Sequence, residues 1–244
     1  MFLHTVWVFS TILMSQIFIA KISSDYTNTI KSNSFVCNAP GSCKAVKSKF
    51  PRTVVLLANG LEVMCDTKTE RGGWVVIQRR FDGHLDFYRG WEEYKFGFGD
   101  FNKGEFYLGN EKIHQLTISR RHALRIDFKF NGKNYYAKYA RFQLYSELEG
   151  YRLKVSGYSG NAGDALTKLH NDQKFSTFDR DNDTEEKDHC ARHFNGGWWY
   201  SDCHEANLNG LWKSDESGKG LIWVPTTGQN ESATFTEMKI KPIY

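Results

Sequence analysis

Residues 175–210, FSTFDRDNDTEEKDHCARHFNGGWWYSDCHEANLNG, decide how this chain folds. Aspartates occupy alternate positions from 179 to 183, cysteines follow at 190 and 203, and the run Gly-Gly-Trp-Trp-Tyr lies between the cysteines. Alternating carboxylates repel one another unless a cation lies among them, and hard oxygen ligands on a short loop suit Ca²⁺ better than softer metals. A cation and a disulfide would together hold a long irregular loop in place, which is typical of a binding region.

The composition is that of a folded globular protein. The chain has 244 residues, of which 40% are hydrophobic and 25% charged. Aromatic residues make up 15%, and there are 21 glycines, a mixture that favours a loop-rich fold with aromatic packing over a helical bundle. The net charge of +4 is modest and the basic residues are scattered, which argues against a nucleic-acid partner. The charge pattern indicates a solvated surface, with an anionic glycan surface as the alternative.

The N-terminus predicts export. Residues 1–20, MFLHTVWVFSTILMSQIFIA, contain no Lys, Arg, Asp or Glu and are mostly apolar, which is typical of a signal peptide. The apolar run is short for a membrane span, which needs about 20 residues. A retained signal anchor is the alternative. Residues 21–36 are polar and read as a linker, so we expect a secreted, extracellular protein with one domain over residues 37–244.

Alternating apolar residues and turn dipeptides predict an antiparallel sheet. Asn59-Gly60 and Asn131-Gly132 are strong hairpin signals between such segments. Further strands are expected at 74–79, 141–144, 151–155 and 235–240, helical segments at 91–94 and after Asn110, and short helical or turn segments at 162–169. The economical architecture is a single α+β domain with a central antiparallel sheet.

Seven stretches together resemble one family. They are CDTKTERGGWVVIQRR (65–80), WEEYKFGFGDF (91–101), EFYLGNEKIHQL (105–116), GYSGNAGDAL (157–166), FSTFDRDND (175–183), NGGWWYSDCHEANLNG (195–210) and EMKIKP (237–242). In this order they resemble the fibrinogen-related domains, the C-terminal globular domains of fibrinogen chains, ficolins, tenascins and tachylectins. The resemblance implies an N-terminal disulfide-linked subdomain, a central antiparallel sheet with short helices, and an irregular Ca²⁺-binding C-terminal subdomain. It implies no enzymatic activity.

The resemblance assigns calcium ligands within the opening stretch. They are the side chains of Asp181 and Asp183 and the main-chain carbonyls of Glu185 and Lys187. An EF-hand is excluded, because its sixth position would be Thr184 instead of glycine and its twelfth a cysteine instead of glutamate. The segment from Asp183 to the next cysteine is one residue longer than the family pattern.

Two disulfides and one remaining cysteine are expected from five cysteines in a secreted chain. No C-x-x-C pair is present, which excludes a zinc ribbon and a thioredoxin-type site. Cys190 is expected to pair with Cys203, stabilising the fold by about 3 kcal/mol. Cys65 is expected to pair with Cys43 or with Cys37. The unpaired cysteine, taken here as Cys37, is a candidate for a link between copies of this chain.

A ligand pocket is implied around His204, Asp202, Cys203 and Phe194. In lectin members of the family the equivalent histidine lines a pocket for acetyl groups, and the peptide bond before the preceding cysteine, here Asp202–Cys203, is often cis. Phe194 keeps the ring of an expected aromatic hydroxyl but loses the donor. The segment 211–223 is about three residues short against the family pattern. Two further aromatic positions fall on Ser217 or a neighbour and on Gln229.

Four tryptophans, 198, 199, 212 and 223, are interpreted as packing residues, with stacking on sugar rings as the alternative. The histidines outside the pocket, His189 and His170 among them, show no metal-like spacing and are expected on the surface or in packing. Asn230 is the expected glycosylation site and Asn182 the less favourable one.

Two functions remain. The first is a lectin-like recognition domain that binds carbohydrate or acetylated groups on glycoprotein surfaces in innate recognition. The second is a protein-binding module of the matrix or of signalling, without sugar binding.

Overall fold

A computed structural model describes residues 39–243, so the predicted signal peptide, the predicted linker and Cys37 lie outside the described residues. The strands are β1 (Arg52–Leu56), β2 (Glu62–Asp66), β3 (Trp74–Arg80), β4 (Phe98–Gly99), β5 (Phe106–Tyr107), β6 (His122–Phe130), β7 (Lys133–Leu144), β8 (Leu153–Gly160), β9 (Ala206–Asn207), β10 (Ile222–Trp223) and β11 (Phe235–Pro242). The helices are α2 (Trp91–Phe96), α3 (Asn110–Ile118), α4 (Cys190–His193) and α5 (Val224–Thr227), and single 3₁₀ turns are η1 (Cys43–Ala45), η2 (Thr69–Arg71) and η3 (Glu147–Glu149).

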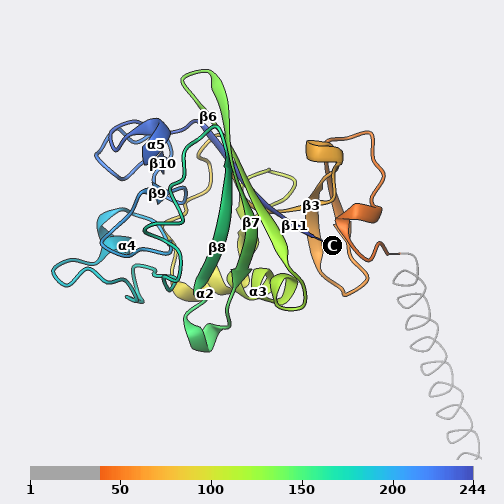
Figure 1. The fold of residues 1–244 in the computed structure, drawn as a ribbon, viewed down its shortest axis with the longest axis horizontal. Coiled ribbons are helices and arrows are strands. Elements are labelled where there is room, and N and C mark those ends of the chain that lie inside the picture. The colour runs from red at the N-terminus through yellow and green to blue at the C-terminus, as the bar shows by residue number, and fades with distance from the viewer. Residues whose placement is uncertain (1–38, 244) are drawn as a thin grey trace, which may run out of the picture.

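The main sheet is antiparallel, as the sequence predicts. Its order is β1-β2-β3-β11-β6-β7-β8, with the small strands β4 and β5 attached beside β3. The C-terminal strand β11 pairs with both β3 and β6, so the end of the chain closes the centre of the sheet. Figure 1 shows β11 between them. The predicted hairpin at Asn131-Gly132 joins β6 to β7, with φ of 46° and 74° at these residues, as a tight turn matched to twisted strands requires.

Several element boundaries differ from the sequence prediction. The segment 141–144 is not a separate strand but the end of β7. Of the two alternatives predicted for residues 162–169, the turn segments are found and the helix is not. The short helices α4 and α5 were not predicted, since four residues are too few to show a helical period. Asn110 is the first residue of α3, and Gly109 is the capping position.

A buried ion cluster ties the middle of the sheet together. The ammonium of Lys239, only 1% exposed, lies 2.7 Å from Asp66, 2.9 Å from Glu237 and 2.6 Å from Asp127. Arg52 reaches Asp66 and Glu237 from β1. Because each buried charge faces an opposite charge, the cluster is compatible with burial between β2, β6 and β11.

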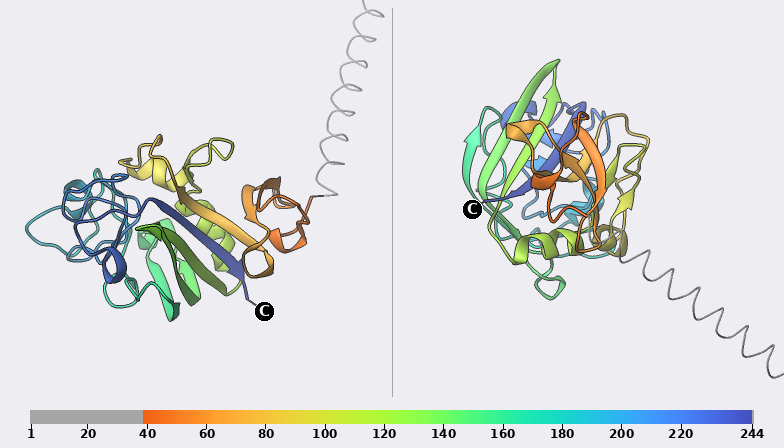
Figure 2. Two further views of the ribbon diagram at one scale, coloured as in Figure 1. Left: turned by 90° about the horizontal axis from the view of Figure 1, so that it is seen from above. Right: turned by 90° about the vertical axis from the view of Figure 1, so that its right-hand side faces the viewer.

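The molecule is elongated, and its two ends differ. The hairpin of β1 and β2 with η1 forms one end, while α4, α5 and the β9–β10 pair lie at the other; Figures 1 and 2 agree on this arrangement. Helices α2 and α3 pack against each other, and α3 packs on β7. Within residues 39–243, no helix combines the length and the apolar character needed to cross a bilayer.

Candidate metal and ligand site

An isolated β-bridge and several buried tryptophans hold the irregular end of the molecule in place. Ser176 and Trp198 exchange backbone hydrogen bonds of 2.8 and 3.1 Å. Trp198, Trp199 and Trp223 are at most 1% exposed, so the packing interpretation is confirmed for these three. Trp199 donates its indole N–H to the carbonyl of Tyr151 at 2.9 Å. The loop therefore packs on a layer of buried aromatic side chains.

Asp179, the first of the three alternating aspartates, binds the polypeptide. Its carboxylate accepts the backbone N–H of Trp91 at 2.9 Å, at the first residue of α2, and the hydroxyl of Thr177 at 2.6 Å. A carboxylate at a helix N-terminus satisfies unpaired N–H groups and complements the helix dipole. This aspartate fastens the loop to α2 and is not directed at the other two.

Asp181 and Asp183 form the metal candidate. Each offers a carboxylate oxygen, and these oxygens and a ring nitrogen of His189 lie within 4.8 Å of one another. The side chain of Asp183 is fully buried and accepts the backbone N–H groups of Glu185 at 3.1 Å and Cys190 at 3.0 Å. Burial, and then the neighbouring Asp181 carboxyl, raise the pKa of Asp183 to about 6. A buried carboxylate beside another carboxylate is an unfavourable arrangement that a cation would relieve.

A second carboxyl pair lies in the same loop. Contact with Asp202 lowers the pKa of Glu185, and the same contact raises the pKa of Asp202. The backbone N–H of Lys187 donates to the Glu185 carboxylate at 3.0 Å. The structure thus brings Asp181, Asp183 and Glu185 into one acidic loop and adds Asp202 from beyond the disulfide. The carbonyls of Glu185 and Lys187 stay predicted ligands.

His189 is the residue that sequence reasoning missed. Its ring lies 3.9 Å from the Asp183 carboxylate, and neither ring nitrogen has a hydrogen-bond partner. No spacing rule identifies it; the only sequence signal was its position next to the disulfide cysteine Cys190. It adds a nitrogen donor to a set otherwise made of oxygens.

The donor set fits calcium better than a softer metal. The carboxylates of Asp181, Asp183 and Glu185 are hard oxygen ligands, which Ca²⁺ binds in flexible geometry. Zinc sites instead use mainly nitrogen and sulfur ligands, and both cysteines beside this loop are in a disulfide. The Asp181 and Asp183 carboxyl groups, whose proximity helps raise the pKa of Asp183, are the structural observation behind this fit.

The disulfides define both ends of the domain. Cys43 pairs with Cys65, which selects one of the two alternatives left open by the sequence. Cys190 pairs with Cys203 with a Cα–Cα distance of 5.6 Å. The Asp202–Cys203 bond is trans, so the cis bond implied by the resemblance is not found. Trans is the form of any non-proline peptide bond unless its surroundings enforce the cis form.

The predicted pocket residues come together, but the space beside His204 is filled. The imidazole is 7% exposed, and the Phe194 ring stands nearly perpendicular to it at 4.4 Å. A Cβ placed on Gly218 would lie 2.4 Å from the Phe194 ring and 3.2 Å from Nε2 of His204. The shortened segment 211–223 therefore folds directly over both rings.

His204 is also electrically neutral. Burial lowers its pKa to about 3, outweighing the nearby backbone of Gly218, which favours the protonated form. Neither ring nitrogen makes a hydrogen bond of good geometry. A buried imidazole whose ring nitrogens make no hydrogen bond is uncommon in folded proteins, so His204 is a candidate for contact with a bound ligand.

His170 shows what a satisfied buried histidine looks like in the same region. Its Nδ1 lies 2.8 Å from the Trp199 carbonyl, and its Nε2 accepts the backbone N–H groups of Glu205 and Ala206, both at 3.0 Å. Burial lowers its pKa to about 4. The expectation that this histidine serves packing is confirmed.

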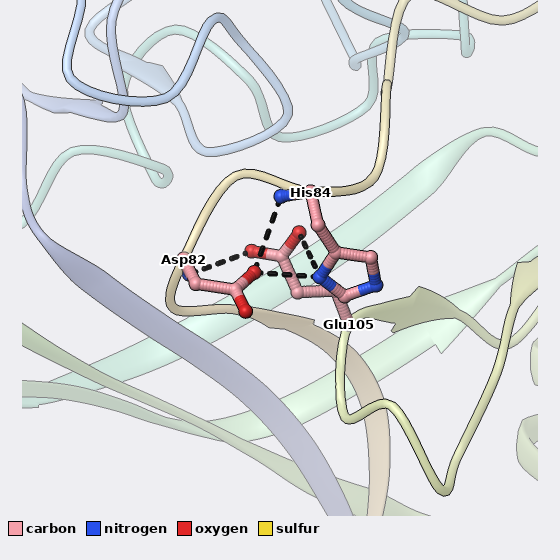
Figure 3. A group of neighbouring side chains, drawn as sticks. All are labelled: Asp82, His84 and Glu105. Carbon is pink, nitrogen blue, oxygen red and sulfur yellow. Dashed lines mark hydrogen bonds and ion pairs between the residues drawn. The ribbon is translucent and has the colours of Figure 1, made fainter.

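Another group of acidic and histidine side chains lies around Glu105, at the turn after β3. Figure 3 shows His84 Nδ1 facing Asp82, at 2.6 Å, and Glu105, at 3.5 Å. The Glu105 carboxylate already accepts four backbone N–H groups, those of residues 81, 82, 83 and 85. Burial alone would raise the pKa of Glu105, but these donors lower it. This cluster organises the turn after β3, so it is a weaker metal candidate.

The two glycosylation sequons differ in how free their amides are. The side-chain amide of Asn182 donates to the Phe175 carbonyl at 2.8 Å, a bond that a glycan on that nitrogen would remove. Asn230 is exposed in the turn after α5. The contacts favour Asn230, which stays a prediction.

Comparisons with known proteins agree with this geometry. Residues 45–243 match the family model of the fibrinogen beta and gamma chains, C-terminal globular domain. The chain is 47% identical over 185 residues to Ryncolin-4 of Cerberus rynchops, covering 74% of this chain and 53% of that protein. It is 43% identical over 206 residues to the fibrinogen alpha chain of Mus musculus, covering 74% of this chain and 26% of that protein. The chain therefore spans about half, or less, of these relatives.

Solved structures show the same fold. The fibrinogen-like globe domain of human ANGPTL2 is 37% identical with a TM-score of 0.78, covering 83% of this chain and 99% of that domain. The globe domain of human ANGPTL6 is 39% identical with a TM-score of 0.75, covering 79% and 90%. A lamprey fibrin D-dimer complexed with the peptide Gly-His-Arg-Pro-amide is 28% identical with a TM-score of 0.75, covering 98% and 88%. This chain belongs to the fibrinogen C-terminal globular domain family.

Proposed function

We propose that this chain is a secreted, calcium-stabilised recognition domain that binds a protein partner through its irregular end. Export is supported by the signal-like residues 1–20 and by two disulfides, which persist in oxidising compartments. Calcium is supported by the facing carboxyl groups of Asp181 and Asp183. The ion would neutralise these groups and hold the loop still, while the ligand is contacted by other residues.

One observation carries the choice of a protein partner over an acetylated sugar. The ring of His204 is covered by Phe194 and by the backbone at Gly218. Recognition of an acetyl group needs an open space with a small apolar wall and a polar contact. Here His204 is only 7% exposed and the backbone at Gly218 leaves no open space beside its ring, so the acetyl-binding lectin is the less favoured function.

A surface suited to a protein partner lies nearby. A hollow of about 300 Å³ separates the turn after β3 from the irregular end, and its lining includes Arg80, Tyr88, Asn195 and Trp212. Tyrosine and tryptophan are among the residue types that most often carry binding energy at protein interfaces, whereas Arg80 is only 2% exposed and donates to the Gly210 carbonyl beneath them. The indole N–H of Trp212 has no hydrogen-bond partner. The lamprey fibrin structure, titled as a peptide complex, supports the idea that this fold accommodates a peptide.

The deciding experiment separates the two functions. The purified chain is passed over N-acetylated resin, once with calcium in the millimolar range and once with a chelator. The Phe194→Ala variant is tested in the same way. We expect no calcium-dependent retention of the wild type. Retention that free N-acetylglucosamine releases would overturn the protein-partner proposal and restore the lectin.

The lectin keeps one specific observation in its favour, which is why it stays the second candidate. His204 has two unsatisfied ring nitrogens, and Phe194→Ala would remove the ring that covers them. If only this variant gains acetyl binding, Phe194 is what closes the pocket, and the wild type does not act as an acetyl-binding lectin.

A further inference from the structure

The end of the molecule opposite the metal loop carries a basic groove. It has a volume of about 480 Å³ and lies where η1 and the following segment meet the turn after β2. Its lining includes the cations Lys44, Lys47, Lys49, Lys68 and Arg71 and no carboxylate. All five are exposed. The whole chain has a net charge of only +4, so this one groove concentrates as much positive charge as the entire protein has in excess.

The fold creates this groove from residues that look scattered in the sequence. The disulfide between Cys43 and Cys65 holds together the two segments that follow these cysteines, residues 44–49 and residues 67–73, which line the groove. The backbone then turns sharply, with positive φ at four successive residues from Glu70 to Gly73. At Gly72 a Cβ would come within 2.6 Å of the Thr67 carbonyl oxygen. This tight turn brings Arg71 against the lysines.

Three cations of the groove have no carboxylate partner among residues 39–243. The side chains of Lys47 and Arg71 make no ion pair or hydrogen bond with any described residue, and Lys68 reaches only the Ser48 carbonyl, at 3.4 Å. The exposed carboxylate of Glu70, the residue before Arg71, pairs instead with Lys138 at 2.8 Å and with Arg125 at 3.1 Å.

Lys241 adds to the positive charge beside the groove. Its ammonium donates to the Gly72 carbonyl at 2.7 Å. Burial lowers the pKa of Lys241; Glu70 opposes this shift, and the nearby charges of Lys138 and Lys44 add to it. Like charges crowd here, and an external anion would relieve that repulsion.

From these observations we infer that the groove binds a sulfated polysaccharide. Lysine ammonium groups act as point charges toward sulfate and phosphate groups, and a row of them suits a polymer that carries many anions. No aromatic ring lines the groove, whereas single-stranded nucleic acids are bound by stacking bases on such rings. A concave groove also fits a chain better than it fits a flat lipid surface. The choice of a sulfated polysaccharide as the ligand rests on the proposed extracellular location. The positive charge of the groove is independent of that proposal.

The test measures binding to heparin fragments at 0.15 M salt and at several higher salt concentrations. The groove variant is Lys47→Gln/Lys68→Gln/Arg71→Gln. The matched control is Lys103→Gln/Lys133→Gln/Lys168→Gln, which removes the same charge at exposed positions outside the groove. We expect about a hundredfold weaker binding and a shallower salt dependence for the groove variant. The control should change by less than about threefold, because distant charges are screened.

Three outcomes would overturn the inference. They are equal losses in both variants, undiminished binding of chemically desulfated heparin, and tighter binding to poly-uridine RNA or to phosphatidylserine vesicles at the same salt. Both variants should keep the calcium-induced rise in melting temperature. Failure of the groove therefore stays distinguishable from failure of the proposed calcium loop.

Discussion

The buried carboxylate of Asp183 accepts the backbone N–H of Cys190 at 3.0 Å. Through this bond the acidic loop and the Cys190–Cys203 disulfide form one mechanical unit. Any cation that binds Asp181 and Asp183 therefore also fixes the first residue of α4. Phe194 follows directly after the last residue of this short helix. Calcium would act on the ligand surface indirectly, by positioning its backbone.

Asp183→Asn should remove calcium binding without harming the calcium-free protein. In chelator, the variant loses a buried charge that Asp181 already disfavours, so its free energy of unfolding at pH 7 should equal that of the wild type or exceed it by about 1–2 kcal/mol. In calcium, the wild type should gain several degrees in melting temperature and the variant should gain none. Thermal unfolding in both conditions measures this. A calcium-dependent rise in the variant would place the site elsewhere.

Asp179→Ala provides the contrast, because this aspartate caps α2. Loss of an N-terminal cap costs about 1 kcal/mol. We expect that loss with and without calcium, and an unchanged calcium affinity by titration calorimetry. Should Asp179→Ala abolish calcium binding, the assignment of Asp179 to the helix alone would be wrong.

Stability should fall as the pH drops below 6.5, because His170 and His204 are buried and neutral. Their pKa values are lowered to about 4 and about 3, so between these values and 6.5 the unfolded chain binds protons that the folded chain does not. Asp183 acts in the opposite direction, since its raised pKa lets the folded state take up a proton near pH 6. From pH 7 to pH 5, in chelator, we expect a net loss of about 2–3 kcal/mol.

Two variants separate these contributions. His204→Leu should remove about 2 kcal/mol of the loss, whereas Asp183→Asn should increase the loss by about 1 kcal/mol. Urea unfolding at pH 7 and pH 5 gives both numbers. Stability that is flat over this range in the wild type would contradict the buried, neutral state of the two histidines.

The sequence predicted the sheet well because its strands carry local signals. The turn at Asn131-Gly132 and the alternation on either side of it sufficed to place β6 and β7. The position of β11 between β3 and β6 came only with the structure, since pairing between distant strands leaves no local pattern. The four-residue helices α4 and α5 were missed for another reason, because so short a segment shows no helical period.

The candidate site was predicted less completely, because its properties depend on contacts across the fold. Asp181 and Asp183 are recognisable from their spacing, but the approach of His189 and Asp202 depends on the disulfide. The closure of the pocket depends on Gly218, whose effect is visible only when segment 211–223 is seen over His204. The basic groove is a similar case, since Lys47 and Arg71 are neighbours only after the Cys43–Cys65 bond forms.

Lys239→Met should be the most destabilising single change outside the disulfides. The ammonium is 1% exposed and faces three carboxylates. Burial alone would raise the pKa of Asp66, but Lys239 lowers it below its usual value, so this carboxylate is charged in the folded protein. Removing one partner of a buried ion pair typically costs 3–5 kcal/mol, roughly, because the other charges stay buried without compensation.

The acidic groups give this prediction a pH signature. Stability from Asp66 is present above its unfolded pKa near 4 and is lost as the pH falls, so the difference between the variant and the wild type should shrink in acid, where protonated carboxyls no longer need Lys239. Lys129→Met, at an exposed position of β6, is the matched control and should change stability by less than about 0.5 kcal/mol. Urea unfolding at pH 7 and pH 4 measures both. Equal effects of the two substitutions at pH 7 would show that the ion pairs of Lys239 with Asp66 on β2 and Asp127 on β6 contribute nothing to the free energy of unfolding.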